Sequence, residues 1–112
     1  MPLPRITAAQ ARRRLLDGAA VLVDVREPDE FTAGHAPGAL PVPLSRLSDG
    51  TAVLPAGRDL MLICRSGNRS RRAADLLAER GVTAPDVIGG LQAWAALGLP
   101  VEDAHGGAGT VV

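Results

Sequence analysis

The stretch that decides the fold is residues 59–70, which read DLMLICRSGNRS. Its first half is almost entirely apolar and predicts a short buried strand that ends at Cys64. The polar residues that follow, with Gly67 among them, predict a tight loop. Beyond the loop, apolar residues at helical spacing predict a helix from about Ser70 to Arg80. A strand, a loop and a helix therefore follow one another, and the single cysteine of the chain closes the strand.

The segments on either side alternate between helices and short strands. Thr7 and Gln10 have the spacing of a capping box, which predicts a helix from there to about Leu16. Other expected elements are buried strands at 21–25 and 86–88, a short helix at 28–31, a helical turn at 44–47, a helix at 91–97, and a loop or short extended piece at 34–43. Buried strands that alternate with helices indicate an α/β fold, a mostly parallel sheet with helices on both faces.

Composition narrows the class of protein. The 112 residues suit one domain, and 46% of them are hydrophobic, enough for a core. Twelve arginines, with no lysine, balance twelve acidic residues, so net charge gives no argument for nucleic acid or a membrane surface as partner. One cysteine makes neither an internal disulfide nor a cysteine-rich zinc site.

The compartment is expected to be the cytoplasm. No apolar run approaches the length of a membrane span, and the first residues lack the pattern of a signal peptide. In a reducing compartment a lone thiol stays available for chemistry.

The placement of Cys64 predicts an active site. In parallel sheets ligands bind at the carboxyl ends of the strands. Amides of a tight loop can converge on an anion, and the N-terminus of the following helix adds a positive end. Arg65 and Arg69 add charge, and Gly67 permits a turn where a side chain would clash. This setting favours a reactive thiolate beside an anionic substrate over an inert buried cysteine.

Four motifs, in order, resemble those of rhodanese-like domains, specifically the small single-domain sulfurtransferases. The resemblance covers about Ile6 to Val101. The motifs are DVRE at 24–27 with Glu30 and Phe31, GHAPGA at 34–39, CRSGNRS at 64–70, and Gly89-Gly90 with Trp94. The resemblance implies a rhodanese-like fold around a five-stranded, mainly parallel sheet, with the domain at 1–103. Residues 104–112 are expected to form a C-terminal tail that is flexible or packs loosely.

The resemblance also implies a double-displacement reaction. The Cys64 thiolate takes a sulfane sulfur from a donor anion such as thiosulfate, and the resulting persulfide passes it to cyanide or a thiol, including a thiol on a protein. No metal or organic cofactor is implied, because the cysteine carries the sulfur covalently. The expected substrate-binding residues are Arg65, Ser66, Gly67, Asn68, Arg69 and Ser70, whose amides would hold the outer sulfur while the two arginines steer the donor.

Four further residues are expected to support the site structurally: Asp24, Arg26, Glu30 and His35. Asp24 and Arg26 follow a strand and are expected to form an ion pair or to anchor neighbouring loops, with Glu30 as a partner of Arg26. In the family the histidine corresponding to His35 mainly braces structure, so a catalytic role is not expected. Ser70 could donate to a substrate or serve as the N-cap of its helix.

Two other functions remain open. Cysteine-dependent phosphatases and arsenate reductases of related fold have five residues between cysteine and arginine, whereas this chain has only residues 65–68 between Cys64 and Arg69. The shorter loop suits sulfur better than a phosphate ester. The second alternative is a non-catalytic rhodanese-like module that binds a partner or senses sulfur. Such modules commonly lack the cysteine, which this chain retains.

Overall fold

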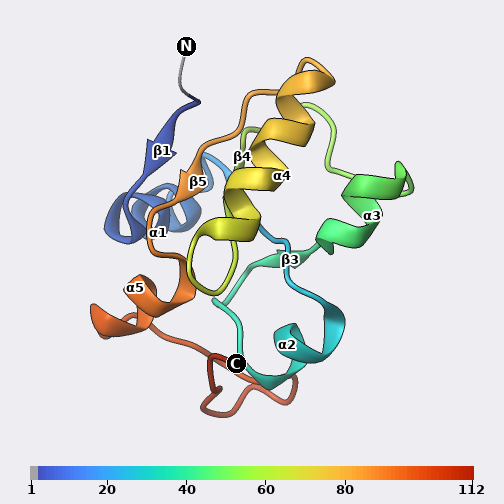
Figure 1. Ribbon diagram of the computed structural model, residues 1–112. Helices are drawn as coiled ribbons and strands as arrows, with labels where there is room; N and C mark the ends of the chain where they lie inside the picture. Colours follow the sequence, from blue (N-terminus) through green and yellow to red (C-terminus); the bar gives the residue numbers. More distant parts are fainter. Residues whose placement is uncertain (1–2) are drawn as a thin grey trace.

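At the centre of the molecule is a sheet of five strands that all run parallel (Figure 1). The computed structural model describes residues 3–112, so the first two residues of the predicted domain lie outside it. The strands are β1 (Arg5–Ile6), β2 (Val21–Asp24), β3 (Leu40–Pro41), β4 (Leu60–Ile63) and β5 (Asp86–Val87), in the spatial order β1-β5-β4-β2-β3. The predicted α/β fold is confirmed, and the sheet is wholly rather than mainly parallel.

Helices cover both faces of this sheet. They are α1 (Ala8–Leu16), α2 (Pro28–Ala33), α3 (Leu44–Asp49), α4 (Asn68–Glu79) and α5 (Gly90–Ala96). Successive residues of the central strands face opposite cores, as the pleat requires. Leu22 and Met61 pack with α1 and α5, whereas Val23 and Leu62 pack with α3 and α4. Burial on both faces explains why β2 and β4 read as continuous apolar runs. Within residues 3–112 no helix is long and apolar enough to cross a membrane.

Local signals set the ends of the helices. At the start of α1, Thr7 and Gln10 exchange the two hydrogen bonds of the predicted capping box. Helix α4 begins two residues earlier than predicted, because Gly67 adopts a left-handed conformation with φ of 105° and acts as its N-cap. Ser70 is therefore not the N-cap but a buried residue of the first turn.

Strands β1 and β3 were not expected as strands of the sheet, although an extended piece was expected near β3. Each has only two residues, too few to show an alternating pattern. They pair with β5 and β2 at the two edges, where a strand needs only one partner.

The pairing of β2 with β4 creates the place for a site. From β2 the chain runs to β3 on one side, then returns to β4 on the other. Ligands bind at such reversals, outside the carboxyl ends of the strands. Asp24 is in register with Ile63, and the amide of Val25 donates to the Ile63 carbonyl at 2.9 Å. The segments that leave β2 and β4 therefore start side by side.

The C-terminal segment is held more firmly than its glycine-rich composition indicates. The amides of Ala104 and Thr110 donate to the carbonyls of Thr32 and Ala33 at 3.1 and 2.9 Å, and Figure 1 places the C-terminus beside α2. The close approach depends on Gly34, because a Cβ there would collide with the Thr110 backbone.

We expect Gly34→Ala to lower the free energy of unfolding by about 1–3 kcal/mol, the usual cost of overpacking. The φ of Gly34 is 177°, extended backbone that alanine adopts freely, so the cost comes from the collision alone. Urea denaturation measures it. Deleting residues 109–112 should remove most of the cost, and an equal cost in the shortened chain would show that this segment does not pack on Gly34.

Candidate active site

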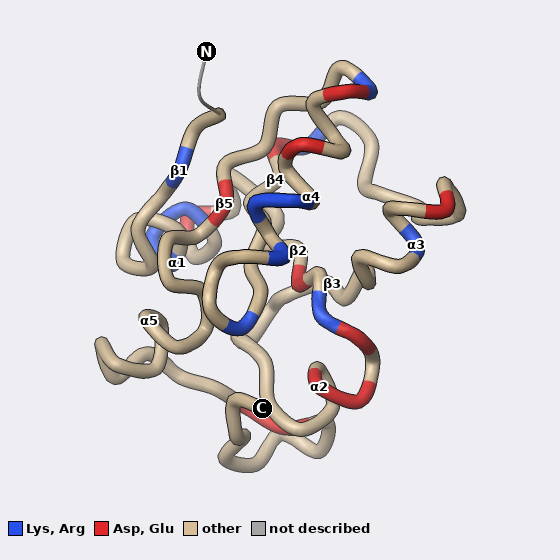
Figure 2. Tube along the Cα trace, in the orientation of Figure 1, with Lys and Arg blue, Asp and Glu red and all other residues tan. Residues whose placement is uncertain are grey.

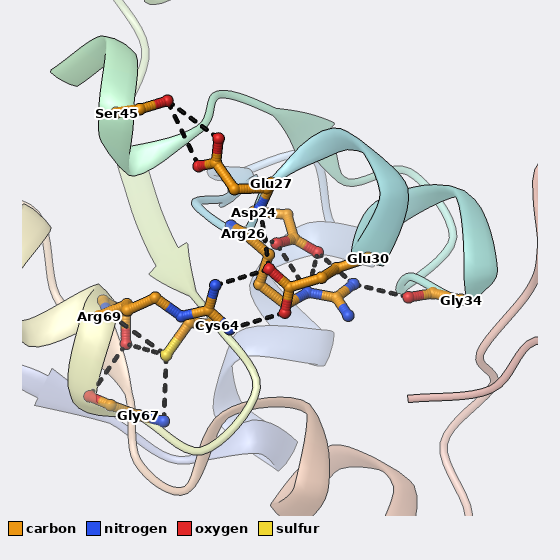
Figure 3. A network of polar contacts seen from close by, with 10 residues as sticks. Asp24, Arg26, Glu27, Glu30, Gly34, Ser45, Cys64, Gly67 and Arg69 are labelled. Carbon is orange, nitrogen blue, oxygen red and sulfur yellow. Dashed lines mark hydrogen bonds and ion pairs between the residues drawn. The ribbon is translucent and has the colours of Figure 1, made fainter. Parts of the chain in front are cut away.

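The thiol of Cys64 lies directly after β4, at the carboxyl edge of the sheet. The residue is 1% exposed. Its sulfur accepts hydrogen bonds from the backbone amides of Gly67 at 3.1 Å and Ser70 at 3.3 Å (Figure 3). The Ser70 hydroxyl is 3.4 Å from the sulfur and donates to the Gly67 carbonyl at 3.2 Å. The first turn of α4 is thus folded around the sulfur, where its amide dipoles favour a negative charge.

The N-terminus of α5 holds this loop from behind. The amides of Leu91 and Gln92 donate to the carbonyls of Cys64 and Arg65 at 2.8 and 3.0 Å. Gly90 allows the approach, because a Cβ there would collide with the Cys64 carbonyl oxygen. The sequence identifies Gly89-Gly90 as part of a family motif but does not predict this contact.

Arg5 is a second neighbour of the loop that the sequence did not reveal. Its Nη2 lies 3.0 Å from the buried carboxylate of Asp86 and 3.7 Å from where a Cβ of Gly67 would be. A Cβ on Gly67 would also come within 3.2 Å of the Gly89 amide. Gly67 is therefore required both by its positive φ and by its neighbours.

Arg69 forms a two-point ion pair with Glu30 on α2. Its two terminal nitrogens lie 2.6 and 2.8 Å from the two carboxylate oxygens. The hydrogen bond from Arg69 lowers the pKa of Glu30, and the bond to Glu30 raises the pKa of Arg69. The prediction that Glu30 pairs with Arg26 is wrong, because Glu30 reaches across from α2 to α4.

Arg26 instead pairs with Asp24, and both side chains are fully buried. The Arg26 Nη2 lies 2.8 Å from the carboxylate and also donates to the Gly34 carbonyl at 2.6 Å. This pair joins the end of β2 to the end of α2. Its remaining terminal nitrogen, Nη1, has no hydrogen-bond partner in the described part of the chain.

His35 contacts Phe31 of α2 and Glu102 of the C-terminal segment. Its Nδ1–H donates to the Phe31 carbonyl at 2.7 Å, and the two rings stack with centroids 3.8 Å apart. Its backbone bridges to Glu102, whose carboxylate is 3.8 Å from Nε2. These contacts tie α2 to the C-terminal segment.

Opposite charges lie on the two segments that flank Cys64 (Figure 2). Arginines occupy the loop and the start of α4, and acidic residues occupy α2. Of the arginines, Arg65, Arg71 and Arg72 are exposed and form no ion pair within residues 3–112. Ser66 and Asn68 are exposed on the same loop.

A family model and several known proteins match this chain over most of its length. The family model of the rhodanese-like domain matches residues 7–97. A sulfurtransferase of Allochromatium vinosum is 36% identical over 90% of this chain and 96% of its own length. An HTH-type transcriptional regulator of Mycobacterium tuberculosis is 35% identical over 91% of this chain, which spans only 46% of the regulator.

Among solved structures, a rhodanese-related protein of Thermoplasma volcanium has a similar fold. It superposes with a TM-score of 0.78 and is 34% identical, covering 88% of this chain and 96% of its own.

We expect Asp24→Asn to lower the free energy of unfolding by about 3–5 kcal/mol, because it leaves the buried guanidinium of Arg26 without a counter-charge. Urea denaturation checks this. The matched control is Asp59→Asn, which removes the carboxylate of an exposed ion pair with Arg14 and should cost about 1 kcal/mol or less. Similar costs for the two variants would contradict the anchoring role of the buried pair.

Proposed function

Because the chain belongs to the rhodanese-like domain family, we propose that it is a sulfurtransferase that carries sulfur as a persulfide on Cys64. One observation carries the proposal. The only cysteine of the chain directly follows the central strand β4, and its sulfur accepts two amide hydrogen bonds at the N-terminus of a 12-residue helix. Amides directed at a sulfur stabilise negative charge on it.

In the first half of the reaction, the Cys64 thiolate attacks the outer sulfur of a donor. With thiosulfate, a new S–S bond forms to Cys64, the old S–S bond breaks, and sulfite leaves with the bonding electron pair. In the second half, a thiolate or cyanide attacks the outer sulfur and the Cys64 thiolate leaves. No proton, electron or cofactor has to be supplied from outside.

We assign different amides of the loop to the two sulfurs of the persulfide, the inner sulfur of Cys64 and the outer sulfur that it carries. The amides of Gly67 and Ser70 hold the inner sulfur. Those of Ser66, Asn68 and Arg69 have no backbone or side-chain acceptor within residues 3–112, and they are the donors we assign to the outer sulfur. The exposed guanidinium of Arg65 attracts the donor anion to the loop that follows Cys64.

The relatives support a transferase and leave its substrates open. The relative from Allochromatium vinosum, matched over nearly its whole length, is named a sulfurtransferase. We propose a small sulfur-donor anion as one substrate, a thiol or cyanide as the other, and the cytoplasm as the compartment that keeps Cys64 reduced.

The relative that is a transcriptional regulator favours a second candidate, a sulfur-sensing module. A sensor would form the persulfide without rapid release, so turnover separates the two. An enzyme delivers many sulfurs per molecule to an added thiol, whereas a sensor delivers about one.

We expect Cys64→Ser to abolish sulfur transfer while the fold stays intact, because a hydroxyl cannot hold a persulfide. Intact-mass measurement after exposure to thiosulfate should show one added sulfur on the original protein and none on the variant. Thiocyanate release in the presence of cyanide gives the rate.

Ser48→Ala, an exposed position on α3, serves as the control and should retain full activity. Transfer by Cys64→Ser at a rate near that of the original protein would refute the persulfide mechanism.

A further inference from the structure

Arg69, the cation nearest in sequence to the start of α4, already has a partner. Both of its terminal nitrogens are engaged by Glu30, at 2.6 and 2.8 Å. The side chain is 37% exposed, so an incoming donor can reach it. A donor anion would meet a guanidinium whose charge is balanced by the Glu30 carboxylate and whose two terminal nitrogens already donate to it.

Glu30 is fixed from its own side as well. The amide of Glu27 donates to its Oε1 at 3.1 Å, which closes the first turn of α2. The positive charge of Arg26 adds to the bonds from Arg69 and Glu27 in lowering the pKa of Glu30. The carboxylate therefore stays ionised near neutral pH, and its side chain is only 20% exposed.

In the thiolate form of Cys64 that the proposed reaction uses, the order of charges from the sulfur outward is negative, positive, negative. Figure 3 shows the guanidinium of Arg69 between the Cys64 sulfur and the Glu30 carboxylate. Cys64 and Glu30 both raise the pKa of Arg69, so the two anions act on the same cation. An anion added at the sulfur has to compete with Glu30 for Arg69.

We propose that Glu30 determines donor specificity by acting as an internal anion that occupies Arg69. The site then disfavours doubly charged donors such as thiosulfate and favours sulfane donors with at most one negative charge, such as the persulfide of a thiol. This inference rests on the proposed persulfide function and revises the expectation that Arg69 steers the donor. Arg65, exposed and without an ion pair within residues 3–112, still attracts either class of anion.

The test compares two donors that deliver the same atom in the same way. Thiosulfate carries two negative charges and releases sulfite, whereas methanethiosulfonate carries one and releases methanesulfinate. Glu30→Gln keeps the size of the side chain and one acceptor oxygen, but it removes the charge and replaces the second acceptor of Arg69 with a donor. We expect kcat/KM for thiosulfate to rise about fivefold, mainly through KM, and that for methanethiosulfonate to rise less than about twofold.

The matched control is Asp29→Asn, which removes the same charge one residue away. Asp29 is exposed on α2 and has no side-chain partner within residues 3–112. Asp29→Asn should leave unchanged the ratio of kcat/KM for thiosulfate to kcat/KM for methanethiosulfonate. If the ratio also rises in Asp29→Asn, the effect is one of general charge on α2 and not of Glu30.

Two results would overturn the inference: an unchanged ratio in Glu30→Gln, or a fall in thiosulfate use, which would make Glu30 a scaffold for Arg69. Glu30→Ala, which leaves Arg69 wholly free, must give a ratio at least as high as Glu30→Gln. Failure of the underlying function looks different, because the unaltered protein would then gain no sulfur from either donor.

Discussion

The parallel pairing of β2 with β4 is the constraint on which the rest of the site depends. It places Asp24 beside Ile63, so the two chains that leave the sheet start from neighbouring points. One leads to the buried Asp24–Arg26 pair and α2, the other to Cys64 and α4. Arg69 and Glu30, 39 residues apart in sequence, can meet only because these strands are adjacent.

Three further contacts hold the segments that follow β2 and β4 in place around the sulfur. The N-terminus of α5 binds the backbone carbonyls of Cys64 and Arg65. Arg26 binds the Gly34 carbonyl and so fixes the end of α2. The C-terminal segment closes over Gly34 and His35. The loop around the sulfur is therefore supported on the side of the sheet, of α5 and of α2, and a preorganised loop needs little rearrangement when charge moves onto a sulfur.

Sequence reasoning found what depends on local pattern and missed what depends on tertiary partners. Runs of apolar residues gave β2 and β4, and the capping box gave the start of α1, because both signals lie within a few neighbouring residues. The two-residue strands β1 and β3 have no such signal. Glu30 is four residues from Arg26, a spacing that suggests a pair on one helix, but Arg26 precedes α2 and is buried against Asp24. Burial decided that Arg26 pairs with Asp24 and not with Glu30, and the spacing of residues in the sequence does not reveal burial of this kind.

The central claim is that the loop from Arg65 to Ser70 is built to hold a second sulfur on Cys64. Crystal structures of the protein after exposure to thiosulfate and, separately, to methanethiosulfonate test it most directly. The account predicts one additional sulfur bonded to Cys64 and directed into the loop, within hydrogen-bond distance of the amides of Ser66, Asn68 or Arg69. An unmodified Cys64 after both exposures, or an added sulfur directed away from those amides, would contradict it.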